Sequence, residues 1–386
     1  MTRTNPRLVG LLQLAALVVG PALLALTANG LAAQVPTGSV VGASAYLETV
    51  SISDPDAAGL DQIDLFTFLF AGSTAIGERV RLGVDGGFAR GSLTRPDGSE
   101  ATVSGLTDTQ VTLSIPFARE FAVFSLVGVL PTGKSEMDAV EAEVANIVAA
   151  DLLPFRISHW GAGGGIGANV GFARPIGRVG VALGVGYVLG REYSPLIDND
   201  FAYRPGNAFT VTGGLDAGVG RAGKLALQLV VQTFSDDQLD GGNLYRAGDR
   251  FQVTGSYAFP VGSGSGLTYA GIVHRSAGDL GEASQGLAIA GSPAQDLVLL
   301  GGGVRLSVGS GVLAPDLAVR VFRRSDGVGQ GSVSRLGVGY EYPLRRVTVI
   351  PSLRAKFGSL QMLAGDSSGL SGFDIGLTVR HGTRRP

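Results

Sequence analysis

Apolar residues alternate with small or polar residues along most of this chain. In the stretch KLALQLVVQTF, Leu225, Leu227 and Leu229 fall on one side, whereas Lys224 and Gln228 fall on the other. A period of two places alternate side chains on opposite faces of a β-strand. The same period recurs in RVRLGVDG, VLAPDLAVRVF, VTVIPSLRAKF and FDIGLTVR. The pattern therefore predicts an all-β chain.

The joins between the predicted strands alternate in length. Short joins are expected at 76–78, 118–120, 174–178, 220–224, 260–266, 309–311 and 343–346, and long polar joins at 53–61, 94–100, 133–159, 192–206, 235–249, 276–295, 324–331 and 360–371. A chain that crosses a membrane repeatedly makes tight turns on one side and large loops on the other, so this rhythm predicts a transmembrane antiparallel up-and-down β-barrel of about 16 strands. Fourteen strands is the alternative, because 101–116 and 121–129 alternate least regularly.

Aromatic residues gather near the short joins. An even number of strands places the N-terminus and the C-terminus of the chain on the same side of the membrane, the side of the short turns. Girdles of aromatic residues mark the membrane interfaces of such barrels. The sequence thus places the short turns and both termini on the periplasmic side. The aromatic residues concerned are Phe117, Phe121, Phe172, Phe259, Tyr340, Tyr342 and Phe357.

The first residues predict a secretory signal peptide. Arg3 and Arg7 precede an apolar stretch at 8–26, and Gly30-Leu31-Ala32 supplies a cleavage site with small residues. A retained membrane anchor is the alternative, but the small residues fit a cleavage site better. We therefore expect a signal peptide over 1–32 and a single barrel domain over 33–386, in the outer membrane of a Gram-negative-type bacterium.

Composition narrows the function further. The 386 residues include no Cys, so disulfides are excluded, and 30 Lys and Arg balance 32 Asp and Glu. Such a balance gives no argument for nucleic acid as a partner. After the leader no stretch reaches the ~20 apolar residues of a membrane helix. No metal-ligand spacing or phosphate-binding loop occurs, so we expect no cofactor and no metal, with membrane lipid and a small solute as partners.

Residues 134–153, KSEMDAVEAEVANIVAADLL, break the strand pattern. Apolar residues recur there at three- and four-residue steps, which predicts one face of a helix. Ser135 and Asp138 have the spacing of a capping box. The helix is expected to fold inward as a constriction or mouth cap, or outward as a lid on the barrel rim. The predicted apolar face consists of Met137, Val140, Val144, Ile147, Val148 and Leu152.

Charged residues suggest what the lumen does. The helical loop is acidic, and it joins the fifth and sixth strands, which lie opposite the thirteenth and fourteenth in a closed barrel. Acids facing a basic wall create a transverse field that filters solutes by charge. The alternative is a wall of mutually paired ions. The pore-lining candidates are Glu136, Asp138, Glu141, Glu143 and Asp151 on the loop, and Arg305, Arg320, Arg335, Arg354 and Lys356 on the wall.

One short region resembles a known family. VLPTGKS, an insertion, and then HWGAGGGIGANVGFARP resemble the PTG and glycine-rich strand of outer-membrane proteins of the meta-pathway of phenol degradation. The resemblance covers about residues 121–175 and implies that Pro131, Thr132 and Gly133 form a structural turn. It also implies a barrel similar to hydrophobic-compound transporters. The chain departs from such barrels in ending RHGTRRP, without a terminal aromatic residue.

Three functions follow from the sequence, in decreasing order of support. The first is a channel or passive transporter for small solutes. The second is a structural or surface-interaction barrel with a closed lumen and partner-binding loops. The third is a barrel hydrolase, for which His274 with Ser276 or Ser284 is the one candidate set, because hydrolysis by a serine needs a base within hydrogen-bond reach. We expect no enzymatic activity. Loop acids such as Asp54 and Asp56 match no calcium-loop spacing.

Overall fold

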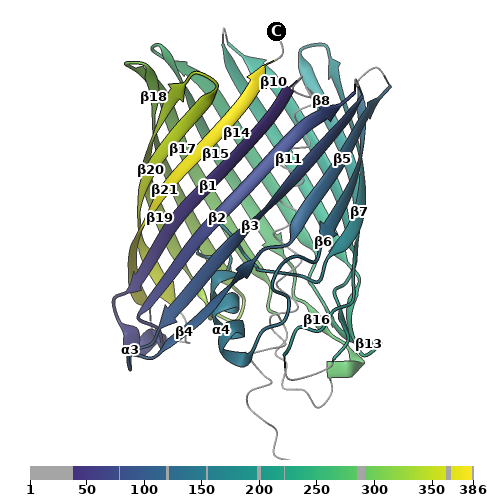
Figure 1. Cartoon of the computed structure of the whole chain (residues 1–386), viewed down its shortest axis with the longest axis vertical. Helices are drawn as coiled ribbons and strands as arrows, with labels where there is room; N and C mark the ends of the chain where they lie inside the picture. Colours follow the sequence, from purple (N-terminus) through teal and green to yellow (C-terminus); the bar gives the residue numbers. More distant parts are fainter. Residues whose placement is uncertain are drawn as a thin grey trace, which may run out of the picture.

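The chain folds as a closed antiparallel β-barrel (Figure 1). The computed structural model describes residues 38–77, 79–118, 121–153, 155–197, 201–220, 222–284, 292–361 and 367–384. The signal peptide predicted over 1–32 lies outside them. In the described residues the barrel has 16 strands, which confirms the predicted fold class and excludes fourteen. It closes where the first strand pairs with the last, Val41 lying opposite His381 and Leu47 opposite Ile375.

Each strand pairs with its neighbours along the chain. β4 and β5 pair one after the other with the same edge of β3 and so count as one barrel strand. The barrel strands are β1 (Gly38–Ile52), β2 (Gln62–Ile76), β3 (Val80–Thr94), β4 (Glu100–Leu106), β5 (Thr109–Phe117), β6 (Ala122–Leu130), β7 (Gly165–Ile176), β8 (Val179–Gly190), β10 (Ala208–Val219), β11 (Gly223–Phe234), β14 (Arg250–Val261), β15 (Gly264–Arg275), β17 (Gln295–Val308), β18 (Gly311–Arg324), β19 (Gln330–Leu344), β20 (Val347–Gln361) and β21 (Ser368–Arg384).

The outer face of the barrel is apolar and exposed. Leu225, Leu227 and Leu229 on β11, and Phe66 and Phe68 on β2, all point outward, each with more than a third of its surface exposed. A water-soluble barrel would instead bury this set and expose the polar one. Exposing these apolar side chains to water would be unfavourable, whereas contact with lipid is not. The barrel is therefore transmembrane, with this apolar band facing the bilayer. Among the described residues, no helix is long and apolar enough to cross a bilayer.

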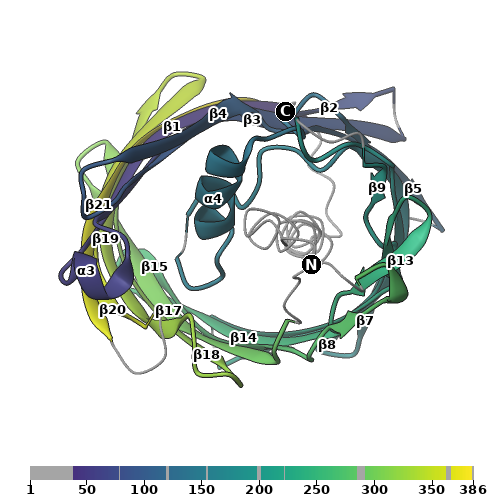
Figure 2. The ribbon, with the colours of Figure 1, turned by 90° about the horizontal axis from the view of Figure 1, so that it is seen from below.

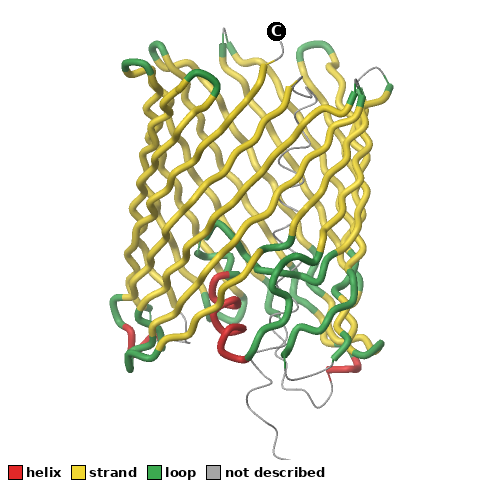
Figure 3. The backbone as a smooth tube through the Cα atoms, viewed as in Figure 1, coloured by secondary structure: helices red, strands yellow, loops and turns green. Residues whose placement is uncertain are grey.

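The two ends of the barrel carry connections of different length, as the alternation of short and long joins in the sequence predicts. Short turns and the C-terminal end of the chain lie at one end, and the long loops lie at the other (Figure 3). Gly177 and Gly309 occupy two short turns with φ of 63° and 59°, a left-handed conformation that glycine adopts without steric cost. Aromatic pairs line this end: Phe117 with Phe172, Tyr257 with Phe259, and Tyr340 with Tyr342.

The long loops carry the remaining elements. Helix α4 (Ala139–Val148) lies inside the barrel, beside β3 and β4 (Figure 2). The other elements are α3 (Pro55–Ala58), the 3-10 helix η2 (Glu282–Ser284) and a small separate sheet of β9 (Tyr203–Arg204), β12 (Asp236–Leu239), β13 (Gly242–Arg246) and β16 (Asp279–Leu280). The buried apolar cluster of the barrel lies at this end, between the inner wall and the α4 loop.

Candidate functional site in the barrel lumen

The segment that contains α4, here called the inner loop (residues 131–164, between β6 and β7), has a well-defined helix start. Asp138 is the N-cap: its Oδ1 accepts hydrogen bonds from the amides of Val140 (2.9 Å) and Glu141 (2.8 Å), and the Glu141 carboxylate accepts from the Asp138 amide (3.3 Å). The capping box is therefore Asp138 with Glu141. The predicted pair of Ser135 with Asp138 is wrong, because Ser135 lies before the first helical turn.

The apolar face of the inner loop packs against the inner wall. Met137, Val144, Val148 and Leu152 are buried, as their spacing predicts, but Val140 is 46% exposed. Ala142 and Ala145 are buried in its place, because the helix begins only at Ala139 and its first turn points Val140 away from the wall. The wall side of this cluster includes Val50, Ile63, Leu65, Leu93, Val103, Phe322 and Val333.

Both ends of the inner loop are held by one carboxylate. Asp108 Oδ1 accepts a hydrogen bond from the amide of Gly133 (3.0 Å), and Oδ2 accepts from the amide of Ala162 (2.7 Å). The Asp108 amide donates in turn to the carbonyl of Trp160 (3.0 Å). Asp108 lies in the break between β4 and β5, where Lys134 takes over pairing with Leu106. The strand break and the PTG turn therefore form one structural unit.

A second set of contacts fixes the second half of the inner loop. Glu48, fully buried on β1, accepts a hydrogen bond from the Arg156 amide (3.0 Å) and pairs with Lys356 Nζ (2.6 Å), which is also buried. The Arg156 guanidinium lies 4.1 Å from the centre of the Tyr46 ring. Trp160 is completely buried, and its Nε1 donates to the carbonyl of Ala89 (2.9 Å). We call the contacts of Glu48, Lys356, Arg156 and Trp160 the latch.

The acids of the inner loop have nearby partners. Glu141 pairs with Lys134 of the same loop, and Glu143 pairs with Arg95 after β3. Lys134 and Arg95 are not among the basic wall residues that the sequence predicts to line the pore. Glu136 is exposed, and Asp138 caps the helix. Glu143 is therefore held at the end of β3, and Glu141 is paired within the inner loop.

The basic residues of the wall are largely paired with acids of neighbouring strands, as in the alternative of a wall of mutually paired ions. Arg354 lies 3.2 Å from Asp374 and 3.5 Å from Asp316, which also lies 3.4 Å from Arg335. Arg305 pairs with Glu341 near the short turn at 309–310, at the opposite end of the barrel from the inner loop. Lys356 belongs to the latch. Glu48, the partner of Lys356, was missed because it lies on the first strand of the barrel and meets β20 only in the closed barrel.

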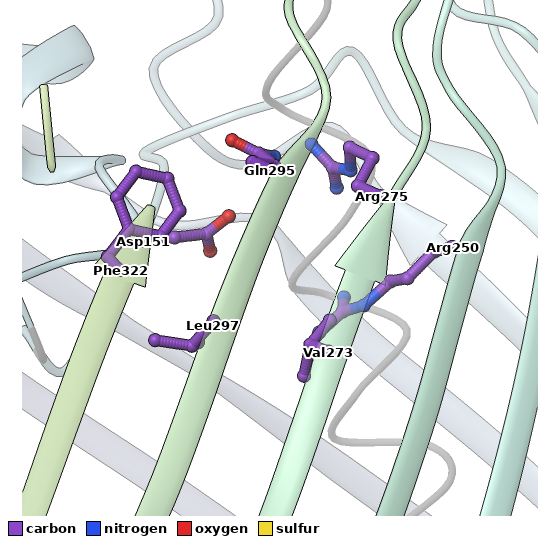
Figure 4. Close-up of a pocket in the computed structure, with 7 residues that line it drawn as sticks. All are labelled: Asp151, Arg250, Val273, Arg275, Gln295, Leu297 and Phe322. Carbon is purple, nitrogen blue, oxygen red and sulfur yellow. The ribbon is translucent and has the colours of Figure 1, made fainter. Parts of the chain in front are cut away.

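Arg320 is the wall residue that reaches the inner loop. Its Nη1 donates to the carbonyl of Asp151 (3.2 Å). The same place contains two arginines that the sequence analysis missed, Arg250 and Arg275, which lie in register at the long-loop ends of β14 and β15. Arg250 precedes the outward Phe251, and Arg275 follows the outward His274, so alternation along the strands could have placed both arginines on the lumen face. They were missed because strand ends are hard to locate from a sequence. Both arginines and Asp151 line one pocket (Figure 4).

The candidate hydrolase set does not assemble. His274 Nδ1 lies 2.8 Å from Asp296 Oδ1, and both side chains are 49% exposed on the outer face. Ser284 is bound to the carbonyl of Gly281 (2.5 Å). Among the residues that the structure describes, no serine hydroxyl is hydrogen-bonded to His274, and no cluster of His, Asp or Glu has the arrangement of a metal site.

Comparisons with known proteins are distant. No protein-family profile matches the chain, and no curated protein matches it in sequence. Among solved structures it is similar to an anion-selective porin from Comamonas acidovorans (15% identity, 89% of this chain and 100% of that one, TM-score 0.41). It is also similar to OmpT, an outer-membrane protein of Vibrio cholerae (10%, 91% and 99%, 0.41), and to an outer-membrane channel from Pseudomonas putida F1 (10%, 91% and 97%, 0.38). These likenesses are too distant to bear on function, and the resemblance to the phenol-degradation family stays a prediction.

Proposed function

We propose that this chain is an outer-membrane channel for the passive passage of small solutes, narrowed at its long-loop end by the inner loop. The observation that carries the proposal is a closed barrel with a lipid-facing apolar exterior and a polar, charged interior. The inner loop packs on the wall of β1 to β4 and β17 to β21. The wall of β7 and β8 carries small inward residues, including Gly167, Gly171 and Gly184, and so contributes few side-chain atoms to the lumen.

We further propose that fixed charges at this level select solutes. In support, Glu143 of the inner loop pairs with Arg95 at the end of β3, whereas Arg320 and Arg335 belong to β18 and β19. Because several of these groups have ion-pair partners, the field between them is weaker than isolated charges would produce. Charge selection therefore depends on the net potential that these pairs leave across the lumen.

The test is deletion of residues 135–152 with a short Gly-Ser replacement. Reconstituted wild-type protein should conduct ions, and the deletion should raise single-channel conductance and change the anion-to-cation permeability ratio. The matched control shortens the turn 325–328, also on the long-loop side, and should leave both quantities close to the wild type. A folded, membrane-inserted barrel that never conducts contradicts the channel. Unchanged conductance after the deletion contradicts the narrowing role of the inner loop.

A second candidate function is a barrel whose lumen is closed to solutes and whose long loops bind partners. The dense packing of the latch, with Trp160 and Glu48 fully buried, favours this candidate because it makes the inner loop a permanent part of the barrel. In that case deletion of residues 135–152 would not increase solute flux, and changes in the separate sheet of β9, β12, β13 and β16 would alter adhesion alone.

A further inference from the structure

Exposed arginines recur at the short-turn end of the barrel. Three of the hairpins that the structure describes carry them, and in each hairpin at least one lies in the turn itself. We call these residues the arginine rim. They are Arg79 in the turn between β2 and β3, Arg174 and Arg178 in the hairpin of β7 and β8, and Arg345 and Arg346 in the turn between β19 and β20.

The acids near this end of the barrel do not neutralise the arginine rim. Among the described residues, the acids nearest the short turns are Asp216, which pairs with Lys224 (2.9 Å), and Glu341, which pairs with Arg305. No arginine of the rim makes an ion pair within 4.0 Å with a residue that the structure describes. The undescribed residues of the short joins add two acids and two bases to the sequence and so leave the balance unchanged: Glu78, Glu120, Arg119 and Arg221. The rim therefore carries an excess of positive charge.

The arginine rim lies at the edge of the lipid-facing band. Arg174 follows the outward Phe172, and its guanidinium carbon lies 5.8 Å from the centre of the Phe121 ring. Outward apolar residues, Ile176 and Leu344, come just before the turns of two of the hairpins. Aromatic residues mark the membrane interface, and an arginine beside them keeps its stem on apolar surface and its charge at the polar boundary. The charges of the rim therefore lie at the level of lipid headgroups.

The arginine rim is spread around the barrel and does not form one patch. Three strand steps, through β21 and β1, separate β20 from β2, and three steps, through β5 and β6, separate β3 from β7. Since neighbouring strands lie about 4.8 Å apart, these hairpins are roughly 14 Å or more from each other. That spacing exceeds the Debye length of about 8 Å at physiological ionic strength. One small anion cannot contact all three hairpins, whereas lipid headgroups surround the barrel and meet each hairpin separately.

We propose that the arginine rim binds the phosphate groups of anionic phospholipids in the leaflet at the short-turn end, and that each hairpin holds its own headgroup. Guanidinium groups match phosphate in geometry and in charge. A basic residue close to an anionic lipid surface contributes about a fivefold preference for that surface. Lipid binding does not require conduction, so the proposal goes beyond the channel function and can fail without it.

The test measures lipid preference beside single hairpins, which is practical because the chain contains no Cys. One protein carries a fluorophore on Ile176→Cys, the β7–β8 label, and a second carries it on Leu344→Cys, the β19–β20 label. Each is reconstituted into phosphatidylcholine vesicles, and quenching by spin-labelled phosphatidylglycerol is compared with quenching by spin-labelled phosphatidylcholine. At both labels phosphatidylglycerol should associate at least about fivefold more strongly. The preference should vanish at about 1 M salt, where the Debye length falls to about 3 Å.

Two double variants control for each other. Arg174→Gln/Arg178→Gln should abolish the preference at the β7–β8 label and keep it at the β19–β20 label, and Arg345→Gln/Arg346→Gln should do the reverse. Unchanged quenching by phosphatidylcholine shows that the barrel is still folded and inserted.

Three results would overturn the proposal. The first is equal association of the two lipids at both labels before any arginine is replaced. The second is loss of the preference at both labels with either double variant, because headgroups held separately respond only to their own hairpin. The third is loss of the preference when soluble glycerol phosphate is added, which would assign the arginines to a free anion.

The outcome for the channel is separate. A barrel that conducts without preferring phosphatidylglycerol keeps the channel and loses the lipid site, and a barrel that prefers phosphatidylglycerol without conducting keeps the lipid site and loses the channel.

Discussion

The latch makes the seating of the inner loop depend on one buried carboxylate. Glu48 on β1 binds both Lys356 Nζ (2.6 Å) and the amide of Arg156 (3.0 Å), and both charged side chains are almost completely buried. Glu48→Ala removes the negative charge and leaves the Lys356 ammonium without its counterion in the same buried place. We expect this single change to destabilise the barrel strongly and to release the second half of the inner loop.

The magnitude follows from the burial of the pair. Breaking a buried ion pair by removing one partner costs about 3–5 kcal/mol. The double variant Glu48→Ala/Lys356→Met removes both charges and leaves only the Arg156 amide without an acceptor, which costs about 1–3 kcal/mol. The double variant should therefore be more stable than Glu48→Ala alone. Lys224→Ala is the control, because its partner Asp216 is 46% exposed and such pairs contribute at most about 1 kcal/mol.

The assay is equilibrium unfolding in urea of the barrel in phospholipid vesicles. Trp160 is the single tryptophan of the chain and lies in the latch, so its fluorescence reports seating of the inner loop directly. Glu48→Ala should shift the emission of the folded protein to longer wavelength and lower the unfolding midpoint. If Glu48→Ala unfolds at the same urea concentration as Lys224→Ala, or if the double variant is less stable than the single one, the reasoning about the buried pair is refuted.

Two further predictions concern the ends of the inner loop and the separate sheet. A Cβ at Gly133 would lie 2.3 Å from the carbonyl oxygen of Trp160, so Gly133→Ala should destabilise the barrel by about 1–3 kcal/mol and shift the Trp160 emission, while Gly128→Ala, with no atom within 4 Å of its Cβ, should do neither. Burial raises the pKa of Asp237 to about 7, although its carboxylate accepts hydrogen bonds from Tyr203 and a backbone amide. The folded state thus holds a proton that the unfolded state releases near pH 4, and this stabilisation is lost as the pH rises toward and through 7. Hydrogen exchange in β12 and β13, corrected for its intrinsic pH dependence, should quicken between pH 5 and 8 in the wild type and not in Asp237→Asn; the same acceleration in both would contradict this assignment.

Much of the fold was determined by the sequence, because a strand shows its two faces in a local period of two. The strands containing Leu225, Val80, Leu317 and Phe373 were located in this way, and so was the rhythm of short and long joins. The helix was found by its three- and four-residue period. Its start was misplaced by three residues, since Ser135 and Asp138 fit a capping box as well as Asp138 and Glu141 do, and only the backbone path distinguishes them.

The tertiary structure decided which charges meet. Barrel closure brings Glu48 next to Lys356, 308 residues along the chain, and strand register brings Asp316 and Asp374 to Arg354. The sequence indicates which side chains face the lumen, because that depends on alternation within one strand. It does not indicate which of them are partners, because a pairing depends on the stagger between strands and on the place where the inner loop packs, and both arise only from contacts made across the closed barrel.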